Sequence, residues 1–430
     1  MPPWESDRIG VLPDEILHHV LSFLPSKGAV QTCLLARRWR HLWKSATGLR
    51  VGDGESDFYL RSVKENQEFL DHLLLLRNSA PLDTHALLCK VQFLQLYVSV
   101  GFRERFLVNE LPLVSRHLTR LQLYGILLND SFLNFSSCPA LEHLVFDSCE
   151  FKCAKISSNS AKHLTITDSK FSMLSRVCID ISSLVSISLR LDDYNCRTPV
   201  LERMPSLVEA FVRVLHCSED FCWESDSGDC GREGCPSCYG IKDNNNCVLL
   251  EGLLEAKTLV LINKYRSFIF KRDLKWCPTF TKLKTLVLDE YWCVPDDFSA
   301  LACILEHAPI LQNLILQINS NGPKHRKKIE GNCHQMDRSV GISGQLEIVE
   351  IRCEVVDTRV LKILKYLSAF NMPNRQEKPS RNKLTYQNKQ RQFPGSTTTG
   401  NGGDDCCPEK KAGGGHGGGD VGGSCAPASS

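Results

Sequence analysis

Cysteine spacing gives the first indication of chemistry in this 430-residue sequence. Between residues 215 and 248, six cysteines crowd into one polar, acidic loop, and two residues separate Cys235 from Cys238. Two thiolates at this spacing can chelate one zinc ion. Cys222 and Cys230 would have to complete the site, because no second closely spaced pair is present. The pattern therefore favours a loop with free thiols over a zinc centre, and no other cofactor is expected.

Catalytic motifs are missing from the sequence. We find no phosphate-binding loop, no Gly-x-Ser-x-Gly nucleophile elbow, no His-Glu-x-x-His pair and no calcium-binding loop. The glycines near the C-terminus form a low-complexity run that does not lie between a strand and a helix, so they do not predict a nucleotide site. We therefore expect a protein that is not an enzyme.

Composition and charge narrow the class further. The formal net charge is +2, too small to attract nucleic acid or an anionic membrane over the whole surface. No apolar run approaches membrane-spanning length, and the charged N-terminus does not resemble a signal peptide. The 21 cysteines are odd in number and spread along the chain. These features predict reduced thiols in the cytoplasm or the nucleus and no membrane partner.

The elements that must position any binding residues begin with residues 12–43, which predict three short helices. Pro13 suits a first helical turn, and apolar residues then recur at helical spacing up to Pro25. A second helix follows, and a third would place Trp39 and Trp43 on one side with basic residues around them. So few residues cannot bury this much apolar surface alone. The surplus must face either the next domain or a partner.

The same stretch resembles the F-box in its plant form, through Asp7-Arg8-Ile9, LPDEIL, LSFLPSKGAV and LLARRWRHLW. Cys33 and Ala36 stand where serine is usual, and both are small enough to keep the fold. The resemblance implies docking onto a Skp-type linker, which tethers the protein to a cullin-based ubiquitin ligase. It implies the following linker contacts: Leu12, Pro13, Ile16, Leu17, Leu24, Pro25, Val30, Leu34, Trp39 and Trp43.

A repeated L-x-x-L-x-L pattern occupies the middle of the chain, with most units about 20 to 28 residues apart. Each unit should form one short strand whose inward residues need a neighbouring unit to bury them, so the units should stack as a parallel sheet. The pattern resembles the irregular leucine-rich repeats that follow the F-box in plant proteins. A single mixed sheet with accidental periodicity is the alternative. The units start at Leu118, Leu141, Ala161, Leu184, Leu207, Ala256, Leu283, Leu311 and Leu346.

These patterns predict an α/β protein with a three-helix F-box, an irregular leucine-rich repeat solenoid and a disordered C-terminal tail. Residues 1–50 would form the F-box, 51–110 a connector and cap with a helix at 58–78, and 111–320 the repeats. Residues 321–370 combine a basic loop with a strand and helix that resemble the start of the FBD region. Residues 371–430 are too polar and glycine-rich to fold.

The expected function is substrate recognition within a Skp-cullin-F-box ubiquitin ligase, with an unknown protein as the target. A scaffold acting outside the ligase is the alternative, and a DNA-binding protein that uses the basic third helix is a weaker one. The near-neutral charge argues against nucleic acid as a partner.

Target-binding candidates are residues just past the predicted strands. Large aromatic side chains off the leucine positions often anchor interfaces, which singles out Tyr291 and Trp292 beside Asp289. Packing of these aromatics against the next unit is the alternative. The other candidates are Tyr124, Asp147, Asp168, Arg190 and Arg213.

Overall fold

The computed structural model describes part of the chain, within the first of two units, Met1–Asn388 and Lys389–Ser430. The described residues are 9, 11–52, 91–98, 106–107, 113–130, 132–172, 175–192, 196–215, 220, 247–263, 269–293, 298–318, 345–369 and 385–386. Several expectations lie outside them: the helix at 58–78, the cysteines proposed to hold zinc in the loop, and the basic run at 323–328. Of the tail predicted to be disordered, only residues 385 and 386 are described.

The N-terminal region is helical, but it does not consist of three α-helices. Helices α1 (Asp14–Leu21) and α2 (Ser26–Gln31) each follow a proline at the N-cap. Three 3₁₀ turns come next: η1 (Thr32–Leu34), η2 (Arg37–Arg40) and η3 (Leu42–Ser45). The predicted third helix is therefore present as two separate 3₁₀ turns and not as one continuous helix. His41, with φ of −123°, leaves the helical region and divides that segment into two tight turns.

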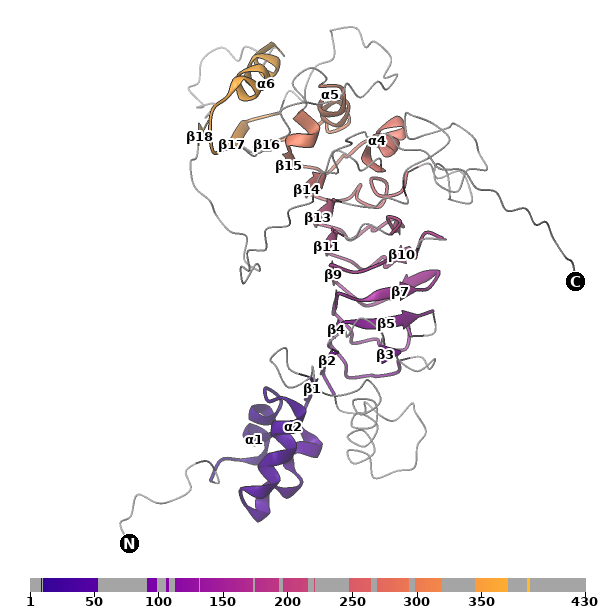
Figure 1. Ribbon diagram of the computed structural model, residues 1–430, viewed down its shortest axis with the longest axis vertical. Coiled ribbons are helices and arrows are strands. Elements are labelled where there is room, and N and C mark those ends of the chain that lie inside the picture. The colour runs from indigo at the N-terminus through magenta and orange to yellow at the C-terminus, as the bar shows by residue number, and fades with distance from the viewer. Residues whose placement is uncertain are drawn as a thin grey trace, which may run out of the picture. The chain divides into compact units, whose positions relative to one another are not determined.

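One parallel sheet contains 12 strands. Figure 1 shows its successive strands lying side by side. Neighbouring strands follow one another in chain order and pair in parallel. The strands are β1 (Gly48–Val51), β2 (Phe93–Tyr97), β4 (Arg120–Tyr124), β6 (His143–Asp147), β9 (His163–Thr167), β11 (Ser186–Leu191), β13 (Glu209–Val214), β14 (Thr258–Asn263), β15 (Thr285–Asp289), β16 (Asn313–Ile318), β17 (Ile348–Cys353) and β18 (Thr385–Tyr386).

The repeat predicted from the leucine pattern is confirmed as a set of strands in matching register. Each of the nine predicted units contributes one strand, which begins two residues after the predicted start. The first residues of these strands pair across the sheet, from Arg120 with His143 at one end to Asn313 with Ile348 at the other. Strand β1 was not predicted, because its segment is short and is followed in the sequence by Gly-Asp-Gly, which is typical of a connector.

A second layer faces the main sheet. In the earlier units it contains two small parallel sheets, and in the later units it contains helices, as the labels in Figure 1 show. The small sheets are β3 (Phe106–Leu107), β5 (Ile126–Asn129) and β7 (Glu150–Lys152), and β8 (Lys155–Ser157), β10 (Cys178–Asp180) and β12 (Val200–Leu201). The helical elements are α4 (Ile269–Asp273), η7 (Leu274–Trp276), η8 (Glu290–Cys293), α5 (Ser299–Glu306) and α6 (Thr358–Ala369).

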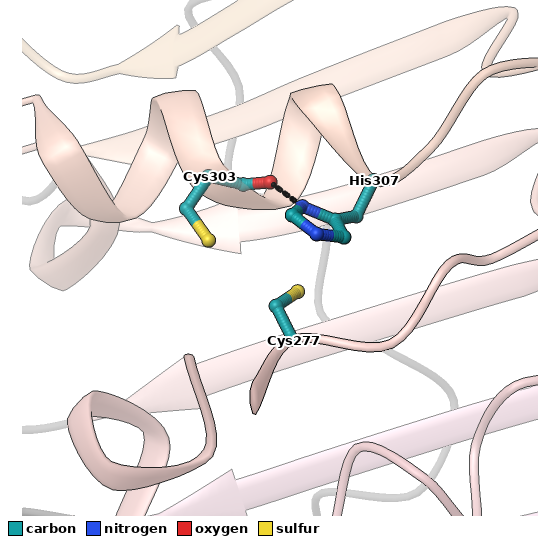
Figure 2. A group of neighbouring side chains, drawn as sticks. All are labelled: Cys277, Cys303 and His307. Carbon is teal, nitrogen blue, oxygen red and sulfur yellow. Dashed lines mark hydrogen bonds between the residues drawn. The ribbon is translucent and has the colours of Figure 1, made fainter. Parts of the chain in front are cut away.

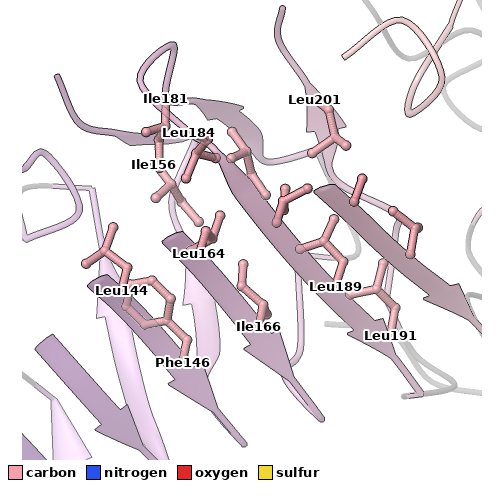
Figure 3. Close-up of a cluster of buried hydrophobic side chains, with 14 of the residues drawn as sticks. Leu144, Phe146, Ile156, Leu164, Ile166, Ile181, Leu184, Leu189, Leu191 and Leu201 are labelled. Atoms are coloured by element: carbon pink, nitrogen blue, oxygen red, sulfur yellow. The ribbon is translucent and has the colours of Figure 1, made fainter. Parts of the chain in front are cut away.

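The hydrophobic core lies between the two layers. In β9, Leu164 and Ile166 point inward while Thr165 points outward, and the same alternation holds in neighbouring strands. Figure 3 shows these inward side chains stacking from one strand to the next. Because each unit relies on its neighbours to cover its inward surface, the strands bury this surface only together.

Three neighbouring strands of the main sheet are each followed by a residue in the left-handed backbone conformation. Gly125, Ser148 and Asp168 directly follow β4, β6 and β9, with φ of 71°, 53° and 48°. A residue in this conformation turns the backbone sharply from the main sheet toward the opposite layer. Asp168 is exposed at this turn.

The predicted strand and helix near the C-terminal end are confirmed as β17 and α6. Strand β18 pairs with β17 and lies inside the segment that was expected to be disordered. Across the part of the chain that the structure describes, no helix is both long enough and apolar enough to span a bilayer.

Candidate functional site

Helix α1 carries two apolar stripes, of which only one is buried. Leu17 and Leu21 lie in the core at 0% and 1% exposure. Ile16 and Val20 occupy the neighbouring stripe and remain 48% and 44% exposed, and Phe23, just past the helix, is 60% exposed. Because residues four apart share one face of a helix, Ile16 and Val20 form a continuous apolar strip. A helix apolar on both sides has more apolar surface than its own domain buries.

Further exposed apolar residues precede and follow α1 in the sequence. Leu34 and Leu35 follow α2 with 84% and 71% exposure. All large exposed apolar side chains of the described residues lie in the N-terminal region except Ile348, Val355, Val356 and Leu361. We call the N-terminal group the exposed apolar set; it comprises Ile9, Val11, Leu12, Ile16, Val20, Phe23, Leu34 and Leu35. Such a concentration of apolar surface is typical of a site that binds another protein.

The structure divides the ten predicted linker contacts into three groups. Leu12, Pro13, Ile16 and Leu34 are exposed. Leu24, Pro25 and Val30 are half-buried. Leu17, Trp39 and Trp43 are buried, at 7% exposure or less, so these three side chains stabilise the helices from inside and offer no free surface.

Sequence reasoning missed several residues of the exposed apolar set, namely Ile9, Val11, Val20, Phe23 and Leu35. The sequence contained a signal for two of them. Val20 and Phe23 lie four and seven residues after Ile16, which is the spacing of a single helix face.

Polar contacts hold the start of α1 against the turn that contains Trp39. The Arg38 guanidinium donates from Nε and Nη2 to Asp14 Oδ1, at 3.1 and 2.5 Å, and from Nη2 to the Leu12 carbonyl oxygen at 2.5 Å. Both side chains are partly exposed, so we expect the ion pair to contribute about 0–1 kcal/mol. Its main effect is to fix the position of Leu12 beside α1.

The helices also contact the first strand of the sheet directly. Arg50 in β1 donates from Nε to the Ser22 carbonyl oxygen at 3.2 Å and from Nη1 to Gln95 Oε1 at 2.7 Å. Gly48 opens this strand, and a Cβ atom placed there would meet the Ser22 carbonyl oxygen at 2.4 Å. Only glycine therefore permits this close approach between α1 and β1.

The structure of this region does not support the DNA-binding alternative. The basic residues lie on two four-residue 3₁₀ turns, and the tryptophans between them are buried. DNA readers of the helical type place a continuous helix in the major groove, which these turns do not supply.

The main target-binding candidates are buried, so the prediction that they form an exposed surface is wrong. Trp292 is 0% exposed and packs against Phe270, with ring centroids 5.2 Å apart, and against Tyr291, at 5.7 Å. Asp289 accepts the Asn263 backbone N–H at 2.9 Å, and burial raises the pKa of its carboxyl to about 8. The chain enters the 3₁₀ turn η8 after β15, which carries both aromatic rings into the core.

Four of the five remaining candidates lie together in one row across the outward face of the sheet, and the fifth, Asp168, lies at the turn directly after β9. Tyr124, Asp147, Arg190 and Arg213 occupy equivalent positions in their strands, with Thr167 between the acid and the first arginine. All are half-buried. Burial, with a smaller contribution from Asp147, raises the pKa of the Tyr124 phenol.

Side-chain contacts order this row. The Tyr124 ring lies 5.6 Å from that of Tyr97, and the Arg190 guanidinium stacks 5.1 Å from the Phe211 ring centroid. Arg213 forms an ion pair with Asp192 at 2.6 Å. The row thus changes from aromatic to acidic to basic along the sheet.

Comparison with known proteins finds sequence similarity in the N-terminal region and over most of the remaining chain. Residues 9–48 match the F-box domain family. An F-box/FBD/LRR-repeat protein of Arabidopsis thaliana is 26% identical over 415 residues, which cover 84% of this chain and 90% of the relative. An F-box/LRR-repeat protein of the same plant is 25% identical over 379 residues, or 75% of this chain and 95% of the relative.

A shorter match is to a putative F-box protein of Arabidopsis thaliana, 28% identical over 265 residues and covering 49% of this chain. The match spans 56% of that relative's length, little more than half. The chain therefore carries an F-box domain at residues 9–48 and is similar, over most of its length, to plant F-box/FBD/LRR-repeat proteins.

Proposed function

We propose that this protein is a substrate-recognition subunit of a Skp-cullin-F-box ubiquitin ligase. The exposed apolar set would dock onto a Skp-type linker, and the linker would join the protein to a cullin. The observation that carries the proposal is the second, unburied stripe of α1, with Ile16 and Val20 exposed on a helix whose other stripe is already in the core. An F-box domain at the same residues supports the choice of partner.

The size of the apolar surface suits a stable interface. Burying a fully exposed large apolar side chain contributes about 1.5–3 kcal/mol. Because Ile16, Val20 and Phe23 are roughly half exposed, each would contribute about half of that amount on docking. Leu34 and Leu35 have more surface to bury and are the strongest candidates for anchors.

The repeats would supply the target-binding surface. We propose that the sheet and its facing layer form an irregular leucine-rich repeat solenoid, which is supported by one strand per unit in a common register. The row of Tyr124, Asp147, Arg190 and Arg213 replaces Asp289, Tyr291 and Trp292 as the candidate contact region. A protein target with both acidic and basic groups would complement that row.

The protein itself would contribute proximity rather than chemistry. Holding a target near a loaded conjugating enzyme converts an encounter between separate molecules into a reaction within one complex. This role needs no catalytic residue and no cofactor in the chain. We also propose a cytoplasmic or nuclear location, where its many thiols stay reduced.

A reconstituted ubiquitylation reaction tests the proposal without knowledge of the target. The chain would be mixed with a Skp-type linker, a cullin, a RING subunit and a loaded conjugating enzyme, and ubiquitin on the chain itself would be measured. We expect modification that requires the linker and is lost in the double variant Ile16→Asp/Phe23→Asp. A chain that binds the linker but never joins an active complex would instead support the scaffold alternative.

A further inference from the structure

Two cysteines and one histidine converge outside the proposed binding surfaces. The Cys277 and Cys303 sulfurs and a His307 ring nitrogen all lie within 4.8 Å of one another. Figure 2 shows the two sulfurs and the ring directed toward a common space. Cys277 follows the turn η7, Cys303 belongs to α5, and His307 is the C-cap of α5.

The backbone holds these elements together. Cys303 and His307 are four residues apart, so they share one face at the end of α5. The Phe280 backbone N–H donates to the His307 carbonyl oxygen at 2.7 Å, which fixes the segment after Cys277 against the end of that helix. The two sides of the cluster are therefore positioned by separate elements joined by a main-chain hydrogen bond.

The orientation of the histidine suits a metal ligand. His307 Nδ1 lies 2.8 Å from the Cys303 carbonyl oxygen, the contact drawn as a dashed line in Figure 2. A hydrogen bond donated by Nδ1 leaves Nε2 as the free ligand atom and fixes the plane of the ring, as metal-bound histidines commonly require. The carbonyl can accept only if Nδ1 carries the proton, which leaves a lone pair on Nε2.

The spacing fits a tetrahedral ion. Zinc binds thiolate sulfur at about 2.3 Å and imidazole nitrogen at about 2.0–2.1 Å, which puts neighbouring ligand atoms about 3.5–3.8 Å apart. Small side-chain rotations would contract a cluster already within 4.8 Å to that size. Two sulfurs and one imidazole nitrogen form a donor set that favours zinc over magnesium or calcium.

We propose that Cys277, Cys303 and His307 bind one zinc ion, which cross-links the segment before β15 to the helix before β16. The three side chains are half-buried, so a water molecule can occupy the fourth position. Cys247 is not part of the cluster, because only the Cys277, Cys303 and His307 ligand atoms all lie within 4.8 Å of one another. None of the three residues belongs to the cysteine-rich loop, and the site does not depend on the proposed ligase role.

Zinc content of the purified full-length chain tests the site, provided that the cysteine-rich loop cannot bind zinc itself. The background protein would carry serine at four loop cysteines: Cys222, Cys230, Cys235 and Cys238. After incubation with zinc and removal of the excess, we expect about one equivalent per chain by elemental analysis. Cys303→Ser or His307→Ala should each remove it. Cys178→Ser changes another half-buried thiol outside the cluster and should leave it in place.

Two further measurements keep the result clear if a variant folds poorly. Cobalt added to the background protein should produce a thiolate-to-cobalt absorption band, which Cys277→Ser should abolish. Zinc should also protect Cys277 and Cys303 of the unmutated chain from alkylation, as mapped by mass spectrometry. Zinc content that is zero in the background protein, or unchanged by both cluster variants, would overturn the proposal. So would a Cys277–Cys303 disulfide, or alkylation that zinc does not slow.

Discussion

Alanine substitution of two neighbouring residues on α1 should have opposite effects on stability and on linker binding. Leu17 is completely buried, so Leu17→Ala removes core contacts and leaves a cavity, at a cost of about 2–5 kcal/mol in the free energy of unfolding. Ile16 is 48% exposed, so Ile16→Ala loses only part of its buried area, about 0.5–1 kcal/mol. Alanine regains roughly 0.5 kcal/mol because it is the better helix former. The net cost at Ile16 should be close to zero.

Urea unfolding followed by tryptophan fluorescence measures the difference, because Trp39 and Trp43 are buried beside α1. Affinity for a Skp-type linker should show the reverse order: Ile16→Ala weakens binding, while Leu17→Ala does so only in proportion to the unfolded fraction. If Ile16→Ala destabilised the protein as much as Leu17→Ala, the assignment of the two stripes to core and surface would be wrong.

Three further changes test the packing of the sheet and its junction with the helices. Asp273→Ala should lower the free energy of unfolding by about 3–5 kcal/mol in urea titrations, because three buried N–H groups, of residues 248–250, lose their acceptor. The raised pKa of the buried Asp289 carboxyl predicts a pH effect. This carboxyl holds its proton up to about pH 8 in the folded chain but releases it near pH 4 in the unfolded chain. The free energy of unfolding should therefore decrease as the pH rises from about 4 to about 8, by up to about 1.4 kcal/mol per pH unit. Asp289→Asn should flatten that slope, and an unchanged slope would argue against a raised pKa. Gly48→Ala should lower the melting temperature by several degrees, since its methyl group would strike the Ser22 carbonyl oxygen.

The register of the sheet was readable from sequence because two independent signals agree. Leucine spacing set the start of each unit, and the alternation of inward and outward residues, as at Leu164 and Ile166, fixed which face each strand turns to the core. A slip of one residue would expose the whole inward set, so the pattern admits a single register.

The orientation of α1 could not be read in the same way. Both of its stripes are apolar, and periodicity alone gives no sign of whether Ile16 or Leu17 faces inward. The contacts that decide it come from Trp39, Trp43 and the first strand, which are distant in sequence.

Residues past the strands were misjudged for a related reason. Tyr291 and Trp292 lie just past a unit and off its leucine positions, which is equally consistent with an exposed aromatic side chain and with one that caps the core. The turn η8 and Phe270 determine the outcome, and neither has a sequence signature. The Cys277 cluster escaped notice because only its Cys-x-x-x-His half is local in sequence.

Direct titration of a purified Skp-type linker into the full-length protein tests the central claim. The double variant Ile16→Asp/Phe23→Asp introduces charge into the exposed apolar set, and Ile348→Asp/Leu361→Asp makes the same kind of change at exposed apolar residues elsewhere. We expect the first variant to lose at least a hundredfold in affinity, about 2.7 kcal/mol or more, and the second to bind like the unmutated chain. Equal affinity of the linker for both variants, with both folded, would contradict the account.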